Sequence, residues 1–380
     1  FGMLAMAVVV GGVGTGLYFA NQNTSGKTIS EKTSQKLDYI NKLIDAKFLN
    51  KVNESDLEDG IYKGLLEGLN DPYSVYYTAE EYRKMMEQTS GTYSGIGALV
   101  SQNAETGIIT VVKAFADAPA AKAGVKNGDI IYKVKGKEVT GVDINNVVTE
   151  MKGEKGTTVD ITVYRESEKK YIDFTITRDQ VNEPTVEYKM LDKKKKIGYI
   201  QISQFEEVTY DQFTKALDDL KKQGMKAVIF DVRSNPGGLY ETVCKMHDEI
   251  LPEGNLVSTK DKYGNEEKQT SDSKCLDMPM VVLQNKDSAS ASEIFAGAIQ
   301  DFNAGKIVGT QSFGKGIVQT ILPLSDGSAG KLTVQDYYTP SGKNIHGKGI
   351  TPDVEAELEE NATSDTQLEK AKETIMELMK

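Results

Sequence analysis

The sequence predicts a multidomain chain that combines an α/β unit and an α+β unit behind a helical N-terminal region. Strand-like and helix-like runs alternate over residues 182–357, which is typical of α/β folds. Residues 91–181 are rich in β-branched residues and turn signals, with two short helical runs, which favours a small α+β domain. Residues 27–90 carry apolar residues at helical spacing. Residues 1–26 and 358–380 complete the expected domain organisation.

The bulk composition excludes several classes of protein. The chain has 380 residues, 39% hydrophobic and 27% charged, which suits a soluble globular protein of two or three domains. Its net charge of −11 argues against nucleic acid or an anionic membrane surface as the main partner. Cys244 and Cys275 form no CxxC motif, so zinc and redox motifs have no support, while a disulfide between them is possible and not required.

The first residues differ from the rest of the chain. Residues 1–20 are almost wholly apolar, and no charge precedes Lys27. This length is about that of a bilayer span, roughly 20 residues. We therefore expect residues 1–26 to be a membrane anchor or a signal peptide, and both export the bulk of the chain. No small-x-small cleavage site is obvious, which favours a single-pass protein of the cell membrane with the bulk of the chain outside the cytoplasm.

Helices are expected over most of the region between Ile29 and Gln88, because apolar residues recur at intervals of three and four. The segment DPYSVYYTAEEYRKMME, residues 71–87, is predicted to begin with a turn and then to continue as helix. The positions that carry the helical period are Leu37, Ile40, Leu43, Ile44, Leu57, Ile61, Leu65, Leu66 and Leu69.

The two larger regions divide into elements in a simple order. In the α+β region we expect strands, a short helix, a further strand and a second helix, followed by a pair of strands. In the α/β region KKKK is expected to be a solvated hairpin turn. The expected elements there are a strand in KIGYIQISQF, a helix at 210–223, the buried strand MKAVIFDVR, a helix at 239–250, and strands near 256–259 and 279–284. An amphipathic helix is expected at the C-terminus.

Three serines stand where a strand-like run gives way to a helix-like run, in KDSASASEIFAGA, residues 286–298. Ser290 with Glu293 has the spacing of a capping box, so one interpretation is that Ser290 only caps a helix. The other interpretation is a nucleophile. A strand-to-helix turn lifts one side chain out of the fold and aims the first free N–H groups of the helix at the group under attack.

A serine hydroxyl is a poor nucleophile without a base. The two histidines, His247 and His346, lie in no recognisable triad motif. A lysine whose amine is kept neutral by burial is the alternative base. Lys315 lies in GTQSFGKGIVQT between two glycines, which let its backbone pass close to another segment. We therefore pair Lys315 with Ser290, and Gln319 follows where its amide can hold the amine.

The loop SNPGG, residues 234–238, follows a buried strand. Two glycines after a proline, Gly237 and Gly238, can turn two backbone N–H groups to one side, as an oxyanion hole requires. The alternative is an ordinary turn.

Together these motifs resemble the carboxy-terminal processing peptidases, also called tail-specific proteases. They occur in the family's order over roughly residues 35–357, with Ser312 where the family often has threonine. The resemblance implies a ClpP/crotonase-like α/β serine protease core and these roles: nucleophile Ser290, general base Lys315, orienting residue Gln319, and oxyanion-hole N–H groups of Ala291 and of Gly237 or Gly238. The matching motifs are DPYSVYYT, GIGALV, AGVKNGDII, DVRSNPGG, SASASEIFAGAIQD, GTQSFGKGIVQT and YYTPSGKNIHGKGITPDV.

The same resemblance implies that residues 91–181 are a PDZ domain that binds a free C-terminal tail beside a strand edge. We expect Arg165 or Arg178 to link a bound peptide to the protease core. Helix-mediated dimerisation and a regulatory partner protein are also plausible. The expected carboxylate-binding loop is Gly95, Ile96, Gly97 and Ala98.

The predicted mechanism is acyl transfer through a serine–lysine dyad, with no metal or nucleotide, since the sequence contains neither GxxxxGK[ST] nor HExxH. Such a chain is expected to cut exported substrates that are unfolded, partly folded or close to the membrane. The main alternative is a non-catalytic, membrane-anchored PDZ scaffold. A third possibility, non-peptidase chemistry on a crotonase-like fold, rests on fold analogy.

Overall fold

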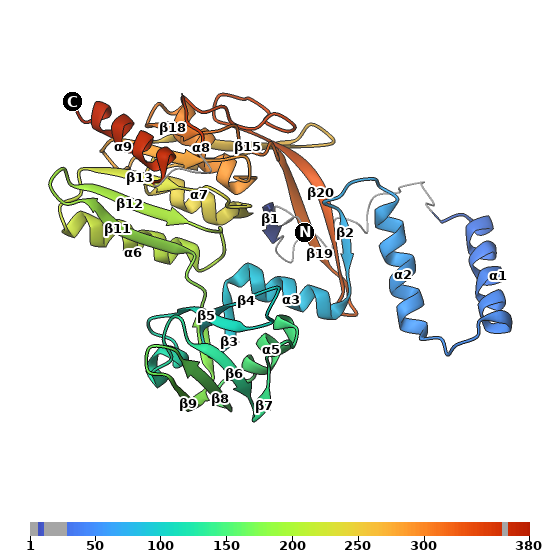
Figure 1. The fold of residues 1–380 in the computed structure, drawn as a ribbon. Helices are drawn as coiled ribbons and strands as arrows, with labels where there is room; N and C mark the ends of the chain where they lie inside the picture. The colour runs from blue at the N-terminus through green and yellow to red at the C-terminus, as the bar shows by residue number, and fades with distance from the viewer. Residues whose placement is uncertain (1–6, 11–28, 359–363) are drawn as a thin grey trace. The chain divides into compact units, whose positions relative to one another are not determined.

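The computed structural model describes residues 7–10, 29–358 and 364–380 (Figure 1). The chain divides into two compact units, which are described separately. Apart from 7–10, the segment expected to be an anchor or signal peptide lies outside the described residues. None of the helices that the structure describes is both long enough and apolar enough to span a bilayer.

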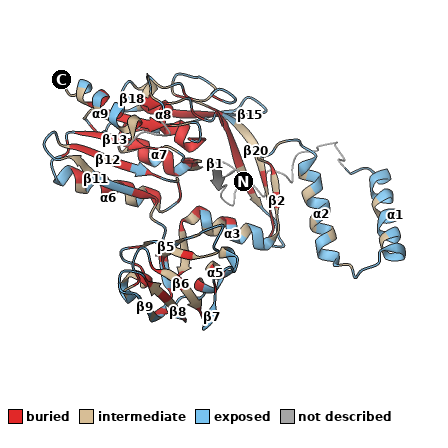
Figure 2. Ribbon diagram, viewed as in Figure 1, coloured by how far each residue is buried: buried red, intermediate tan, exposed pale blue. Residues whose placement is uncertain are grey.

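One unit is formed by residues 8–82 and 318–334. Its helices α1 (Glu31–Lys47) and α2 (Glu54–Glu67) contain no buried residue, and Figure 2 shows them largely in pale blue. Ser30 caps α1, since its side chain accepts a hydrogen bond from the Thr33 N–H. The predicted helices of this region are therefore present.

The prediction for residues 71–87 was only partly right. The turn is there and α3 (Ala79–Ser90) follows, but Val75–Tyr77 forms a strand, β2, between them. β2 pairs antiparallel with β20 (Ala329–Tyr338), with Val75 opposite Lys331. The partner lies more than 250 residues away in the sequence, so local periodicity did not reveal it. In the same unit β1 (Ala7–Val10) runs parallel to β19 (Ile317–Pro323).

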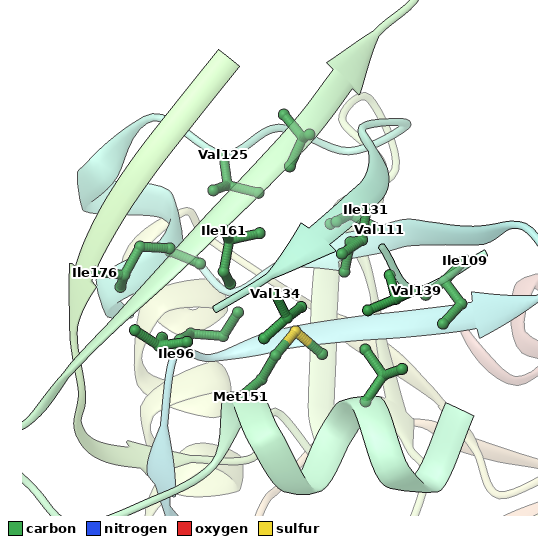
Figure 3. Packing of buried hydrophobic residues seen from close by; sticks show 14 residues of the cluster. Ile96, Ile109, Val111, Val125, Ile131, Val134, Val139, Met151, Ile161 and Ile176 are labelled. Atoms are coloured by element: carbon green, nitrogen blue, oxygen red, sulfur yellow. The ribbon is translucent and has the colours of Figure 1, made fainter. Parts of the chain in front are cut away.

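The other unit contains residues 83–317 and 335–380, and its first part is the α+β domain predicted from the sequence. An antiparallel sheet in the order β4-β5-β6-β8-β9 packs with α5 around the apolar cluster of Figure 3. Ile109, Val163 and Ala120 at its centre are completely buried. The elements are β4 (Ala98–Gln102), β5 (Ile109–Ala114), α4 (Pro119–Ala123), β6 (Ile130–Val134), β7 (Lys137–Glu138), α5 (Ile144–Met151), β8 (Thr158–Arg165) and β9 (Lys170–Thr177).

Two buried arginines hold this domain together. Arg165 makes a bidentate ion pair with Asp129, with N–O distances of 2.7 and 2.8 Å. Arg178 donates to the carbonyl oxygens of Met151 and Glu150 at the end of α5. We expected one of them to link a bound peptide to the protease core, but both guanidinium groups bond within the domain itself. Their contacts therefore give them a structural role.

Two short strands connect this domain to the rest of the unit. β3 (Thr92–Gly95) pairs antiparallel with β10 (Asp179–Asn182), so the entering and leaving segments form one ribbon. The ribbon continues into the core at Gly91, whose carbonyl oxygen accepts a hydrogen bond from the Glu183 N–H.

The core of the unit is an α/β layer structure, as the sequence predicts. Its sheet has the order β11-β12-β13-β17-β18-β21, parallel except for β11. α9 covers one face over Ile229 and Val281, while Phe230 on the other face packs against Phe213 of α6 and Phe295 of α8. The elements are β11 (Val186–Asp192), β12 (Ile197–Ile202), α6 (Thr209–Lys222), β13 (Ala227–Asp231), α7 (Tyr240–Asp248), β17 (Met280–Gln284), α8 (Ala291–Asp301), β18 (Gly305–Gly309), β21 (Val354–Glu355) and α9 (Thr366–Leu378).

The order of the sheet places the two loops singled out in the sequence. β13 and β17 are parallel neighbours, with Phe230 opposite Val282. The SNPGG loop follows β13 and the serine segment follows β17, so both leave the same edge of the sheet. The remaining strands of the unit, β14 (Gly238–Leu239), β15 (Gly254–Asp261) and β16 (Glu266–Ser271), belong to a second sheet in which β15 pairs with the end of β20. The lysine run 193–196 is the turn between β11 and β12, as predicted.

Candidate active site

Hydrogen bonds fasten the serine segment to the SNPGG loop. The Ala289 N–H donates to the carbonyl oxygen of Asn235 at 3.0 Å, and the Ser292 hydroxyl donates to the same oxygen at 2.9 Å. Asn235 is itself completely buried and donates through Nδ2 to the Ile202 carbonyl oxygen. The loop and the start of α8 therefore form one rigid assembly.

The three serines of this segment differ in their hydrogen bonds. The Ser288 hydroxyl donates to the carbonyl oxygen of Val232 at 2.8 Å, and that of Ser292 is bonded to Asn235. The Ser290 hydroxyl has no hydrogen-bond partner among the residues that the structure describes, although the residue is 0% exposed. A buried hydroxyl without a partner is costly and calls for an explanation. Only the middle serine has its hydroxyl available for chemistry.

The backbone at Ser290 is also strained. Its φ of 58° and ψ of −114° fall outside the regions that residues with a side chain normally occupy. Such conformations cost of order 1–3 kcal/mol and cluster at functional sites. Ser290 begins α8 in the capping-box arrangement with Glu293 that the sequence suggested. The Glu293 carboxylate accepts from the Ser290 N–H at 2.8 Å, while the hydroxyl itself is left without a bond.

Glu293 has a larger role than its capping position indicated. Its carboxylate accepts four hydrogen bonds, from the N–H groups of Ser290, Gly314 and Lys315 and from the Ser312 hydroxyl, at 2.5–2.8 Å. Burial raises the pKa of this carboxyl, and the four donors oppose that rise. The sequence offered one signal, the position three residues after Ser290, but not the partners from a distant loop.

Glu293 fixes the distance between the two candidate catalytic residues. One oxygen, Oε2, accepts from the backbone nitrogens of both Ser290 and Lys315, each at 2.8 Å. The two nitrogens are therefore separated by no more than twice that distance. Lys315 is 0% exposed, which is rare for a lysine. The structure thus brings Ser290 and Lys315 together inside the same core.

The glycines beside Lys315 behave as the sequence suggested. A Cβ atom on Gly316 would lie 2.5 Å from the His346 backbone nitrogen, and one on Gly314 would lie 2.9 Å from that of Lys348. Residues 346–349 therefore press directly against the lysine loop, and only glycine permits this approach. His346 accepts from the Gly316 N–H, and His247 is buried against Phe295 with its pKa lowered by burial to about 4.

The two glycines of the SNPGG loop occupy different positions. A Cβ atom on Gly237 would lie 2.8 Å from the Ser290 Cβ and 3.0 Å from the Ala291 nitrogen, so Gly237 touches the serine turn. The Gly237 N–H donates to Asn235 Oδ1 at 2.8 Å. A Cβ atom on Gly238 would lie 2.2 Å from the Phe205 carbonyl oxygen. Ala291 is the first residue of α8, where backbone N–H groups have no partner inside the helix.

Gln319 lies on β19, in the other compact unit, two residues after the strand begins. It is buried, and its side-chain Nε2 donates to the Thr333 hydroxyl oxygen at 3.2 Å.

The expected peptide-binding loop stands at the edge of the α+β domain. Ile96 is buried and its carbonyl oxygen accepts from the Ala120 N–H, while Gly97 has a φ of +75°. A Cβ atom on Gly97 would lie 2.2 Å from the Ala118 Cβ. β4, which starts at Ala98, has only β5 as a neighbour in the described sheet. Its other edge is placed to pair with an extended peptide.

Protein-family models match the chain over most of its length. The description "Peptidase family S41" matches residues 196–356, and "PDZ domain" matches 94–176. The description "Activating protease CtpB N-terminal domain" matches residues 16–81. The fold and these matches together place the chain in the class of serine peptidases that carry a PDZ domain.

The chain belongs to peptidase family S41 and is similar to its CtpA-like serine proteases. It is 37% identical over 341 residues to a probable CtpA-like serine protease of Staphylococcus aureus strain MRSA252, covering 88% of this chain and 67% of the relative. A protein of the same description from Staphylococcus epidermidis strain RP62A is 37% identical over 324 residues, covering 84% and 65%. The chain spans about two thirds of the length of these relatives.

Solved structures agree with this assignment. The photosystem II D1 C-terminal processing protease has a TM-score of 0.50 and 27% identity, with 91% of each chain covered. A putative S41 protease from Bacteroides fragilis has a TM-score of 0.55 and covers 88% of this chain and 92% of its own. Its identity of 16% supports the fold alone.

Proposed function

We propose that the protein is a serine endopeptidase of the carboxy-terminal processing type, with Ser290 as nucleophile and Lys315 as general base. The observation that carries this proposal is the hydroxyl of Ser290. It has no hydrogen-bond partner among the described residues, on a strained turn whose N–H shares one carboxylate oxygen with the N–H of Lys315. Gln319 follows Lys315 by four residues and is proposed to orient its amine.

The proposed reaction proceeds in two steps. The neutral amine of Lys315 removes the proton from Ser290 as the hydroxyl oxygen attacks a peptide carbonyl carbon. The resulting ammonium protonates the leaving amine, and water then hydrolyses the acyl-enzyme. We propose that the Ala291 N–H and the Gly238 N–H stabilise the oxyanion. Gly238 is preferred to Gly237 because the Gly237 N–H is bonded to Asn235.

Access to the site requires an opening. Ser290 and Lys315 are both 0% exposed, so a substrate carbonyl reaches them only after neighbouring segments move. This burial supports a protease whose activity is regulated, in agreement with the match to the domain described for an activating protease. A partner protein or bound peptide is proposed to supply the opening.

Substrates are proposed to be exported proteins recognised by their C-terminal tail. The support is the PDZ domain, with its loop Gly95–Ala98 and the edge of β4. A membrane location with the catalytic part outside the cytoplasm rests on the apolar sequence of residues 1–20 alone. We also propose homodimerisation, which rests on the family resemblance alone.

The test is cleavage of an unfolded protein substrate by wild type, Ser290→Ala and Lys315→Ala, with folding checked by circular dichroism. We expect wild type to cut and both variants to lose at least about 10³-fold of the rate. A Lys315→Ala variant as active as wild type would place the base elsewhere.

The non-catalytic scaffold makes the opposite prediction. It requires tail peptides to bind while no variant, wild type included, cleaves under any condition that opens the site. Amidating the substrate's C-terminus then tests the PDZ domain separately, since an amide cannot supply the carboxylate that the loop binds. Cleavage is expected to weaken through a higher KM.

A further inference from the structure

Gln319 is held by a residue that the sequence did not single out. Its Nε2 donates to the Thr333 hydroxyl oxygen at 3.2 Å, from β19 to the neighbouring strand β20. An amide has a donor end and an acceptor end, and only the acceptor end can receive a hydrogen bond from an amine. Because Nε2 donates to Thr333, the orientation of the amide is set, and Oε1 is the atom that can accept a hydrogen bond from an amine.

Thr333 is in turn held by the turn DPYS, residues 71–74. Its backbone N–H donates to the Ser74 hydroxyl oxygen at 3.0 Å, across a separation of 259 residues in the sequence. The Ser74 hydroxyl donates to Asp71 Oδ2 at 2.6 Å, and the other carboxylate oxygen accepts from the Tyr73 N–H. Ser74 is buried, so these bonds are shielded from water.

The pairing of β2 with β20 fixes the register of this contact. Val75, directly after the turn, stands opposite Lys331, and Tyr77 stands opposite Ala329. Lys331 is buried, with its Nζ 5.5 Å from the centre of the Tyr77 ring, and burial lowers its pKa. The carboxylate of Asp71 opposes that effect. β20 is therefore bound to the N-terminal region by both backbone and side chains.

We propose that Thr333 is a positioning residue for Gln319, and that the DPYS turn holds Thr333 in place through Ser74 and Asp71. The N-terminal region thereby sets the orientation of the residue that orients the catalytic lysine. This inference rests on the proposed function, because Gln319 matters only if Lys315 is the base. The DPYS turn would then affect catalysis without contacting the substrate. The hydrogen bonds that connect it to Thr333 and Gln319 all lie within one compact unit.

The test compares Thr333→Val with Thr333→Ser. Valine keeps the shape and the backbone N–H but removes the hydroxyl oxygen, while serine keeps the oxygen and loses only a methyl group. We expect Thr333→Val to lower kcat by about tenfold to a hundredfold with KM unchanged, because the amide is no longer held in place. Thr333→Ser is expected to retain kcat within about threefold.

Rates are expressed per active site, counted by stoichiometric labelling with a fluorophosphonate, so that a loss of folded enzyme does not count as a loss of kcat. Ser74→Ala is the second variant, and we expect it to lower kcat by a smaller factor than Thr333→Val does. The inference is overturned if Thr333→Val matches wild type per labelled site, or if Thr333→Ser is as slow as Thr333→Val. If Ser290→Ala also cleaves, the proposed function itself has failed. This result can be told apart from the two outcomes for the Thr333 variants.

Discussion

Two buried glutamates in the same compact unit have opposite surroundings. Glu293, at the start of α8, is 0% exposed and its carboxylate accepts four hydrogen bonds. Glu206, where the ribbon from the PDZ domain meets the core, is 6% exposed, and its Oε2 has no hydrogen-bond partner among the described residues. A carboxylate with all its donors present stabilises its site, whereas one without them destabilises the fold around it.

Glu206 is also crowded. A Cβ atom on Gly91, at the foot of the ribbon, would lie 2.3 Å from its Oε2. Burial raises the pKa of Glu206 to about 8, and the charge of Glu183 adds to the effect. The Glu207 N–H donates to the Thr89 carbonyl oxygen beside it. The turn at Ser290 is therefore firmly attached through Glu293, whereas the junction with the PDZ domain contains a costly buried carboxyl group.

The largest effect is expected from Glu293→Gln. In either amide orientation the new NH₂ group faces at least one backbone N–H that now donates to the carboxylate. Leaving such buried donors unsatisfied costs about 1–3 kcal/mol each. We expect a loss of roughly 2–5 kcal/mol of unfolding free energy in urea. Unchanged stability together with full peptidase activity would show that the carboxylate does not hold the Ser290 and Lys315 segments.

A smaller effect, an increase in the free energy of unfolding, is expected from Glu206→Gln. A folded-state pKa of about 8, against 4.5 ordinarily, means that the folded protein keeps a proton that the unfolded chain releases. Stability therefore falls as pH rises from about 4.5 to about 8, and then levels off. Glutamine mimics the neutral form and removes this loss.

We therefore expect Glu206→Gln to match wild type at pH 4 and to be more stable at pH 9, by on the order of 3 kcal/mol. The measurement is urea unfolding across that pH range. Glu207→Gln, on the adjacent residue, serves as the control. A constant difference between Glu206→Gln and wild type at all pH values would contradict the unfavourable environment assigned to Glu206.

The sequence predicted the layers of the fold for identifiable reasons, and it singled out Ser290 and Lys315, whose catalytic roles stay predictions. Periodicity showed the helices, and alternation showed the PDZ strands. The glycines around Lys315 indicated a close backbone approach, and the structure has that approach to residues 346–349. These features are local, so a single sequence carries them.

What the sequence did not reveal depends on partners far apart in the chain. β2 is a strand because it pairs with β20. Glu293 holds two segments together because Ser312, Gly314 and Lys315 donate hydrogen bonds to its carboxylate. Arg165 or Arg178 was expected to link a bound peptide to the core, yet the hydrogen bonds of both guanidinium groups lie within the PDZ domain. Among the described residues the Ser290 hydroxyl has no hydrogen-bond partner, which distinguishes it from the hydroxyls of Ser288 and Ser292. This difference is likewise visible only in three dimensions.

The most direct test of the account is to identify which serine becomes covalently modified. Wild type and Lys315→Ala would be incubated with a fluorophosphonate, digested and analysed by mass spectrometry. We predict an adduct on Ser290 alone, formed at a rate that falls at least about 10²-fold in Lys315→Ala. An adduct on Ser288 or Ser292, or equal labelling rates in the two proteins, would contradict the Ser290–Lys315 assignment.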